Sequence, residues 1–374
     1  MKFRWADLDV PTLTFFIVTT LGALIGPIWY FQNFAWSWWI LVYVLVFGAI
    51  AGMSITGGYH RLFAHRSYEA NRIVRLAYLF FGASAFQGSA LQWCSDHRIH
   101  HRHVDTDKDP YSIRKGFFYA HIGWLFDRRH PRYQNPFPND LTSDPWMLFQ
   151  HRYYVPIALL AGFGLPTLMG WFFDSAAMGF WFGGVVRLVI GHHGTFFINS
   201  ACHTFGRQPY SDSHTAKDNA VLAFLTYGEG YHNYHHEFQF DYRNGIRWYQ
   251  WDPTKWWIQA LSGLGLASKL RRVSEGRILQ ARLKMQKVHL QRRGVWGERL
   301  LNLSQRVEEA YQRAEKLRSD YAEFEKTIRN REQFQRLQVE VLRLKAEWQM
   351  ARVEFQKSYA QWKIYLRTLE RLPA

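Results

Sequence analysis

Long apolar segments alternate with charged segments along the chain. Four apolar segments each approach the length of about 20 residues that a helix needs to cross a bilayer. They are residues 12–31, 36–57, 155–173 and 176–200. Only residues 32–35 separate the first pair, and only Asp174 and Ser175 separate the second pair. The pattern therefore predicts an all-α fold with four transmembrane helices in two hairpins.

The positions of Lys and Arg predict how these hairpins are oriented. Neither hairpin loop contains Lys or Arg, whereas residues 1–10, 58–154 and 201–374 hold nearly all of them. By the positive-inside rule, both termini and both large polar segments are cytoplasmic. A soluble protein with buried core helices would not produce this asymmetry, so we expect an integral, multi-pass membrane protein capped by a cytoplasmic helical domain.

Two apolar stretches also carry polar residues. Arg187 lies within the fourth predicted span, where a charge is costly, so it should face the protein interior or a cavity. Residues 71–93 contain Arg72, Arg75, Gln87 and Gln92. That composition favours a helix lying at the membrane interface over a fifth crossing.

Beyond about residue 272 the apolar pattern changes to heptads, which predict a coiled-coil extension. One frame contains Leu300, Val307, Ala314, Tyr321 and Ile328, and a second contains Phe334, Val341, Trp348, Phe355, Trp362 and Leu369. The change of frame fits either a hairpin of two antiparallel helices or a phase break in one longer helix. A solvated amphipathic helix is the alternative, which the aromatic positions disfavour. We therefore expect a membrane domain, residues 1–271, and a coiled-coil extension, residues 272–374, that supports oligomerisation or docking.

Composition restricts the partners. The formal net charge of +16 suits a lipid surface, a phosphate-bearing substrate or nucleic acid, but the chain has no recognisable nucleic-acid-binding motif. Aromatic residues make up 18% of the chain, including 17 Trp, as is common at membrane interfaces. Two cysteines, Cys94 and Cys202, are too few for a disulfide framework. No signal peptide is evident, since the first apolar run lacks a cleavage pattern.

Eight histidines occur in three spaced motifs. His60 and His65 form HxxxxH, and two HxxHH motifs contain His97, His100 and His101, and His232, His235 and His236. Positions i, i+3 and i+4 share one face of a helix, so each HxxHH should direct three imidazoles toward a common point. With 17 His among 374 residues, two such motifs are not expected by chance. The spacing predicts a metal centre.

The number of ligands indicates two metal ions, because a structural zinc site closes with four. The chain contains no HExxH, so a metalloprotease has no general base in the expected place. A dizinc hydrolase usually includes bridging carboxylates, and none lies inside these motifs. Two iron ions for oxygen chemistry fit better, although spacing alone leaves a dizinc site open. Candidate acceptors for the outer imidazole N–H groups are Asp96, Asp105, Asp109 and Glu237.

These motifs, as they stand in the sequence, resemble those of stearoyl-CoA desaturases and bacterial Δ9 acyl-CoA desaturases. The strings are His60-Arg-Leu-Phe-Ala-His65, Asp96-His97-Arg-Ile-His100-His101 and Gly228-Glu-Gly-Tyr-His232-Asn-Tyr-His235-His236. The resemblance runs from about residue 36 to 265. It implies a ninth ligand, His203 of Asn199-Ser-Ala-Cys-His203, with Asn199 reaching the metal through water. Asn199 and His203 are i and i+4 on a helix, which agrees with that role.

The resemblance also implies substrate contacts. Gln87, Trp93 and Thr195 match residues that shape a kinked acyl tunnel, and Arg128, Arg129 and Asp96 match residues that contact CoA. Contact with lipid phosphate is the alternative for the two arginines. Ser95 stands where animal enzymes use an Arg for CoA, which leaves another acyl carrier open. His192 is expected to line the tunnel, and the remaining histidines to be structural or exposed.

The reaction implied by the resemblance removes two hydrogens from adjacent methylenes of a saturated acyl chain, at Δ9, and reduces O2 to water. We find no haem domain, cysteine-rich iron–sulfur motif or GxGxxG fingerprint, so a separate ferredoxin or reductase should supply electrons. The bacterial inner membrane is the expected location, with the active site cytoplasmic. A membrane lipid hydroxylase or acyl-lipid desaturase remains the alternative. A metal transporter would place its ligands nearer mid-membrane.

Overall fold

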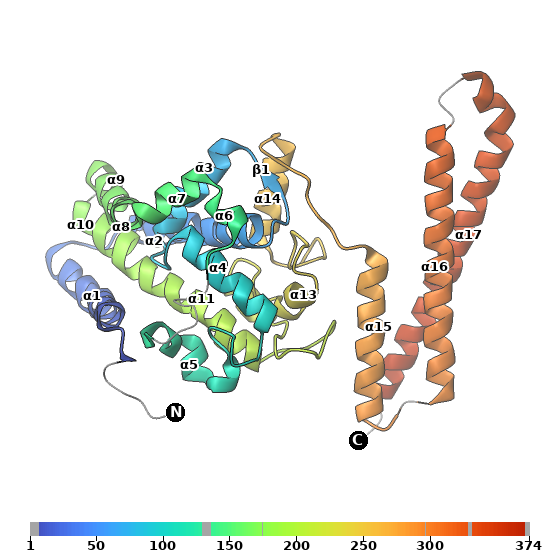
Figure 1. The fold of residues 1–374 in the computed structure, drawn as a ribbon, viewed down its shortest axis with the longest axis horizontal. Helices are drawn as coiled ribbons and strands as arrows, with labels where there is room; N and C mark the ends of the chain where they lie inside the picture. Colours follow the sequence, from blue (N-terminus) through green and yellow to red (C-terminus); the bar gives the residue numbers. More distant parts are fainter. Residues whose placement is uncertain (1–6, 129–135, 174, 296, 328–330, 371–374) are drawn as a thin grey trace. The chain divides into compact units, whose positions relative to one another are not determined.

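The computed structural model describes residues 7–128, 136–173, 175–295, 297–327 and 331–370. The chain divides into two compact units, Met1–Val273 and Ser274–Ala374. Helices dominate both units (Figure 1). Among the described residues, the strands form one antiparallel pair, β1 (Glu69–Ala70) with β2 (Ala267–Ser268).

Three helices of the first unit are long and apolar enough to cross a membrane: Val10–Asn33, Trp39–Ala64 and Tyr154–Phe173. The first is α1 (Val10–Asn33), and the second joins α2 (Trp39–Met53) to the π-helix η2 (Ser54–Ala64). The third joins α8 (Tyr154–Leu159), η6 (Leu160–Gly164) and α9 (Leu165–Phe173). These helices cover the first three predicted spans.

The fourth predicted span is helical but less apolar. It consists of α10 (Ala176–Met178), η7 (Gly179–Val186) and α11 (Arg187–Thr204). It is not among the candidate membrane spans of the described residues, because Arg187, His192 and His193 reduce its apolar character. A fourth crossing therefore stays a prediction.

Arg187 faces the protein interior, as its position in an apolar helix requires. Its side chain is buried, and it donates to the carbonyl oxygens of Gly183 at 2.8 Å, Ser84 at 2.7 Å and Gly162 at 2.8 Å. Hydrogen bonds from a charged donor to three carbonyls offset part of the cost of removing the guanidinium from water. This side chain links α11 to the end of α3 and to η6.

Close helix contacts hold the apolar helices together. A Cβ atom at Gly179 would lie 2.1 Å from the carbonyl oxygen of Pro166, so any larger residue would push η7 away from α9. A Cβ atom at Gly26 of α1 would lie 2.1 Å from the Trp181 ring of η7. Small residues at such positions allow helices to approach closely, which matters in lipid because the hydrophobic effect does not drive helices together there.

The predicted single helix over residues 71–93 is wrong. The segment contains α3 (Arg72–Ala83) and α4 (Ala90–His103), separated by a turn. Phe86 and Gly88 adopt positive φ angles of 52° and 95° in that turn, and Ser89 caps α4 by accepting from the Gln92 N–H. The turn places Gln87 beside the metal motif of α4.

Shorter elements complete the first unit. They are η3 (Ile113–Lys115), α5 (Phe117–His121), η4 (Gly123–Phe126), α6 (Asn139–Thr142), α7 (Pro145–Arg152), α12 (Ala220–Leu225), α13 (His232–Glu237) and α14 (Pro253–Gly263). A buried cluster that includes Tyr59, Leu62, Leu91 and Ile258 packs η2 against α4 and α14. This core supports the helices that carry the histidine motifs.

The second unit consists of α15 (Glu275–Arg292), α16 (Glu298–Thr327) and α17 (Arg331–Glu370) (Figure 1). Ring contacts pair Tyr311 with Phe355 and Tyr321 with Trp348, so α16 and α17 run antiparallel. Of the two alternatives for the change of heptad frame, the structure has the antiparallel pair.

The core of the second unit uses residues from both heptad frames. Leu300 and Val307 of α16 and Trp362 of α17 are buried together with Leu279, Leu283 and Leu290 of α15. Trp362 also donates from Nε1 to Gln286 Oε1 at 2.8 Å. The heptad positions therefore bury against a third helix of the same chain, and coiled-coil pairing between chains stays a prediction.

Candidate metal centre and substrate cavity

The nine predicted histidine ligands meet in one place and form two groups. The five-histidine group contains His60, His65, His97, His101 and His235, and the four-histidine group contains His100, His203, His232 and His236. Within each group, each histidine offers one ring nitrogen, and these nitrogens all lie within 4.8 Å of one another. Each group draws on several motifs.

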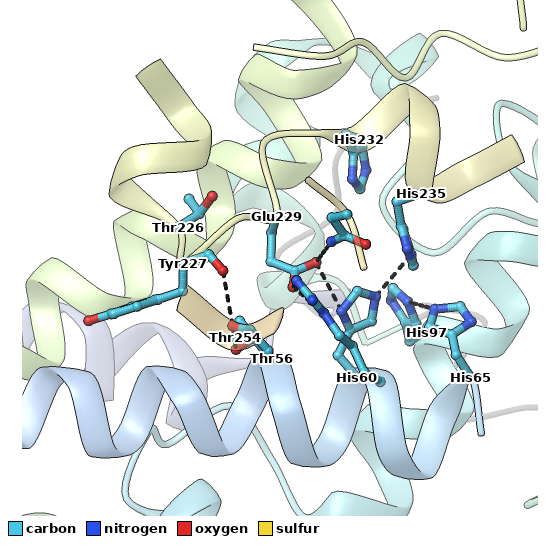
Figure 2. Close-up of polar contacts among 12 residues, drawn as sticks. Thr56, His60, His65, His97, Thr226, Tyr227, Glu229, His232, His235 and Thr254 are labelled. Carbon is cyan, nitrogen blue, oxygen red and sulfur yellow. Dashed lines mark hydrogen bonds and ion pairs between the residues drawn. The ribbon is translucent and has the colours of Figure 1, made fainter. Parts of the chain in front are cut away.

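The π-helix η2 explains why HxxxxH works as a pair of ligands. In an α-helix, residues five apart differ by about 140° around the axis, because each residue turns about 100°. A π-helix closes its hydrogen bonds from i to i+5, so its wider turn brings residues five apart closer to one face. His65 N–H donates to His60 O at 3.0 Å in this manner. Both side chains therefore point toward the five-histidine group, as Figure 2 shows.

The spacing predicted that each HxxHH motif directs three imidazoles toward one point, and this prediction is wrong. On α4, His97 and His101 join the five-histidine group, whereas His100 joins the four-histidine group. On α13 the division is reversed, with His232 and His236 in the four-histidine group and His235 in the other. Residues i and i+4 stay together because they are nearly in line along a helix, and residue i+3 serves the neighbouring group.

The separations between imidazole nitrogens suit metal ligands. The Nε2 atoms are 2.7 Å apart for His65 and His97, and 2.9 Å apart for His60 and His235. In the other group, His232 and His203 are 3.1 Å apart. Two nitrogens bound at right angles to one ion, each about 2.1 Å from it, would be about 3.0 Å apart. Both groups therefore fit a bound ion, and imidazole nitrogen suits iron, zinc, copper and nickel.

Burial favours the neutral form of seven of the nine imidazoles. It lowers the pKa values of His65, His97, His101, His203, His232, His235 and His236 well below the usual range, and neighbouring histidines lower them further. A neutral imidazole has a lone pair for a metal, whereas a protonated one has none. The groups are therefore ready to bind ions near neutral pH.

Acidic side chains orient the outer nitrogens of three histidines. His100 Nδ1 lies 2.8 Å from Asp109 Oδ1, and His203 Nδ1 lies 2.7 Å from Thr215 Oγ1, which donates to Asp105 Oδ1. Burial alone would raise the pKa of Asp109, but His100 and two backbone N–H groups outweigh it, so the pKa is lowered. Two of the four acids considered from sequence thus support ligands, Asp109 directly and Asp105 through Thr215.

The third acid, Glu229, was missed from sequence. Its Oε2 lies 2.9 Å from His60 Nδ1, and its carboxylate also pairs with Arg61 (Figure 2). Burial would raise the pKa of Glu229, but His60 and Arg61 together hold it at about 2. The sequence feature that could have indicated Glu229 is an acidic residue three positions before His232, in the string Gly-Glu-Gly. Of the other candidates, Asp96 accepts from Gln92, and Glu237 is exposed.

A cavity of about 560 Å³ lies beside the histidines, within the usual range of about 300–1,000 Å³ for ligand pockets. Gln87, Trp93, Asp96, Thr195 and Asn199 all line it, together with His60, His97, His100 and His232. Trp93 Nε1 donates to Gln87 Oε1 at 3.1 Å, and Gln87 Nε2 donates to Thr195 Oγ1 at 2.8 Å. A polar bridge therefore joins α4 to α11 in an otherwise largely apolar wall.

The structure does not test the two arginines that were expected to contact CoA. Arg128 is exposed, and its backbone N–H donates to Asp7 O at 2.8 Å. Arg129 lies outside the described residues. Ser95 is buried and donates to Leu91 O of its own helix. The carrier contacts remain predictions.

Histidines outside the motifs serve different purposes. His192 lines the cavity and lies with Nε2 2.8 Å from Ala85 O, and His193 contacts His121 at 3.0 Å. His214, expected to be structural or exposed, is buried with its ring centroid 5.1 Å from that of His236. The sequence around His214, in the loop before the third histidine motif, did not indicate that this side chain lies beside His236.

Comparison with known proteins agrees with this geometry. The family model for fatty acid desaturases matches residues 8–268, which contain all nine histidines. The chain belongs to the fatty acid desaturase family. Together with the three candidate spans, membership makes the chain a membrane protein. The extension beyond residue 272 lies outside the matched part.

Several relatives of this family member carry acyl-CoA desaturase names. A probable acyl-CoA desaturase of Schizosaccharomyces pombe is 45% identical over 240 residues, which is 64% of this chain and 50% of that protein. Acyl-CoA desaturase 1 of Saccharomyces cerevisiae is 42% identical over 71% of this chain and 53% of its own length. Stearoyl-CoA desaturase of Homo sapiens is 36% identical over 71% and 74%. The chain thus spans about half the length of the two fungal relatives.

Proposed function

We propose that this chain is an O2-dependent fatty acyl desaturase that inserts a cis double bond, at Δ9, into a saturated acyl-CoA. One observation carries the proposal: two groups of histidines lie beside a largely apolar cavity whose wall contains a polar bridge. The names of the relatives support the same substrate class.

Each group of histidines would hold one iron ion, with Asn199 contributing through water. Two bound iron ions supply an oxidant that removes hydrogen from unactivated methylenes with O2, which no side chain can do. The residues of the chain position the acyl chain and exclude water from the reacting carbons. The bridge of Trp93, Gln87 and Thr195 lies in the cavity wall, where it would constrict the cavity and bend an acyl chain, which favours cis geometry.

We further propose the arrangement in the cell. Residues 1–271 form the desaturase domain with four membrane spans, and the active site and both termini face the cytoplasm, in a bacterial inner membrane. A separate ferredoxin or reductase supplies the two electrons. Residues 272–374 provide a surface for self-association or donor docking, supported by their compact helical fold. Asp96, Arg128 and Arg129 contact CoA in this proposal.

A membrane lipid hydroxylase, or a desaturase of acyl-lipids, would use the same ligand set. The buried Ser95, which donates to its own helix, favours the acyl-lipid alternative because it offers no charge to CoA phosphate. A hydroxylated product would indicate the first alternative, and unsaturation only in intact lipids would indicate the second.

The test is expression with a reductase system in cells that lack desaturases, followed by analysis of double-bond positions in total fatty acids. A new cis-Δ9 product supports the proposal. If protein shown to contain iron yields no unsaturated product, the proposed desaturase function is wrong. A variant with His203→Ala is the control, because it lacks one proposed ligand; its folding is checked by thermal unfolding alongside the wild type.

A further inference from the structure

We propose that Glu229 is a positioning residue for the five-histidine group: it fixes the tautomer and orientation of His60 and ties the HxxxxH motif to the third histidine motif. The inference rests on the proposed function only in that the group holds iron. Glu229 lies outside the HxxxxH motif and both HxxHH motifs, three residues before His232.

Four hydrogen-bond donors converge on the Glu229 carboxylate. Oε2 lies 2.9 Å from His60 Nδ1 and accepts from Asn244 Nδ2 at 2.8 Å. Oε1 accepts from Arg61 Nε at 3.3 Å and from Arg61 Nη2 at 2.9 Å. Glu229 is only 3% exposed, so water does not replace these partners.

This arrangement determines which nitrogen of His60 carries the proton. An ionised carboxylate only accepts hydrogen bonds, so His60 must donate from Nδ1. The lone pair is then on Nε2, which faces His235 Nε2 at 2.9 Å inside the five-histidine group. A carboxylate that fixes the tautomer of a ligand histidine also raises its basicity toward the metal.

His60 packs against three other members of the five-histidine group. Its ring centroid is 4.8 Å from that of His65, 4.5 Å from that of His97 and 4.4 Å from that of His235. A rotated or wrongly protonated His60 would therefore disturb three neighbouring ligands. The four-histidine group does not include His60 and should be affected less.

Arg61 and Asp252 anchor Glu229 from the other side. Arg61 is buried and donates from Nη1 to Tyr242 O at 2.8 Å and to Asp252 Oδ2 at 3.1 Å. Asp252 is fully buried and accepts from the backbone N–H groups of Asn244 and Gly245. Two carboxylates and one guanidinium thus form a buried network that connects η2 to the residues on both sides of α13.

Only a carboxylate satisfies both sides of this network. Glutamine has the same shape but one acceptor oxygen, so its NH2 group would face either Arg61 or the His60 and Asn244 donors. Leaving a buried donor without an acceptor is destabilising, and more so when the donor is charged. Glu229→Gln should therefore release His60 from its tautomer without creating a cavity.

Asp241 provides a matched control. It is a buried carboxylate of the same unit that accepts from Arg243 Nη2 at 2.8 Å, from Tyr234 Oη at 2.8 Å and from Val273 N–H at 2.9 Å. Its donors include an arginine but none of the nine histidines. Asp241→Asn tests how much a buried ion pair alone contributes to the fold.

The experiment measures iron content, the Mössbauer spectrum and thermal stability of the purified full chain after loading with 57Fe. We expect Glu229→Gln to lower iron affinity about 10- to 100-fold, with loss concentrated in one of two iron environments. Asp241→Asn should keep the wild-type iron content and spectrum at a similar loss of thermal stability. Retention of wild-type iron and spectrum by Glu229→Gln, or equal iron loss in Asp241→Asn, would overturn the inference.

A double-variant cycle separates positioning from general destabilisation. If Glu229 acts through His60, His60→Ala with Glu229→Gln should lose no more iron than His60→Ala alone. Additive losses would contradict the inference. If Glu229→Gln yields no folded protein, Glu229→Asp replaces it, because the shorter carboxylate keeps its charge near Arg61 but withdraws from His60. These readouts do not need a desaturated product, so failure of the proposed function would be distinguishable.

Discussion

Gln87 and Thr195 meet in the wall of the cavity, with Gln87 Nε2 donating to Thr195 Oγ1 at 2.8 Å although the residues are 108 positions apart. Trp93 holds the other end of the Gln87 amide through its indole N–H. Because both ends of the amide are occupied, Gln87 has one orientation. We therefore expect these contacts to fix the shape of the cavity wall beside the histidines.

Thr195→Val keeps the shape of the side chain but removes the acceptor for Gln87. The loss of one hydrogen bond, about 1 kcal/mol, should loosen the constriction, reduce product several-fold and spread the double bond over neighbouring positions. Mass spectrometry of derivatised fatty acids measures this. Thr19→Val, which removes a hydroxyl bonded to its own helix at Phe15 O, should leave the positions unchanged. An unchanged product from Thr195→Val would contradict the role of the bridge.

Asp109→Asn should weaken the four-histidine group. Asp109 accepts from His100 Nδ1, and an amide would no longer impose the tautomer that directs the lone pair of His100 inward. We expect a 10- to 100-fold loss of iron affinity, measured by metal analysis after dialysis against a chelator. Asp107→Asn, at an exposed position nearby, is the control. Equal iron content in both variants would count against this support role.

Gly52→Ala should restrict the cavity from the α2 side. A Cβ atom there would lie 2.4 Å from Cε2 of Tyr227, and both residues line the cavity. The Tyr227 ring would have to shift into the cavity or away from it. We expect conversion of the longest accepted acyl chains to fall most, measured with substrates of graded length. Gly263→Ala meets open space and should leave chain-length preference intact; a parallel change in both variants would argue against this explanation.

Trp362→Ala should destabilise the second unit selectively. Trp362 is fully buried, and truncating a buried Trp costs about 3–5 kcal/mol. We expect faster proteolysis and hydrogen exchange in α15, α16 and α17, with wild-type iron content. Gln361→Ala, at the exposed neighbouring position, is the control. Loss of iron from Trp362→Ala would show that the two units are energetically coupled.

Local spacing was sufficient to predict eight of the nine histidines that come together, but not their division into two groups. Eight histidines could be assigned from three motifs, and His203 followed from family resemblance. The exchange of ligands between motifs depends on how η2, α4 and α13 approach one another, which is a tertiary property. The turn at Phe86 and Gly88 was missed because an apolar run of that length resembles one helix, and only positive φ angles reveal the break.

Supporting residues were harder to predict than ligands. Asp109 lies eight residues after His101 and was a reasonable candidate, but Glu229 pairs with a histidine 169 positions earlier in the chain. Pairing over that separation leaves no periodic signal in a single sequence. The apolar spans were recognisable for the opposite reason, since about 20 apolar residues must follow one another to cross a bilayer.

The mixing of ligands between the two groups has a consequence for biosynthesis. The five-histidine group needs His60 and His235, and the four-histidine group needs His100 and His236. Neither site can be completed by the first half of the chain as it leaves the ribosome. A metal ion that needs either complete group can therefore load only after translation has passed residue 236, so a truncated chain presents only partial, low-affinity sites.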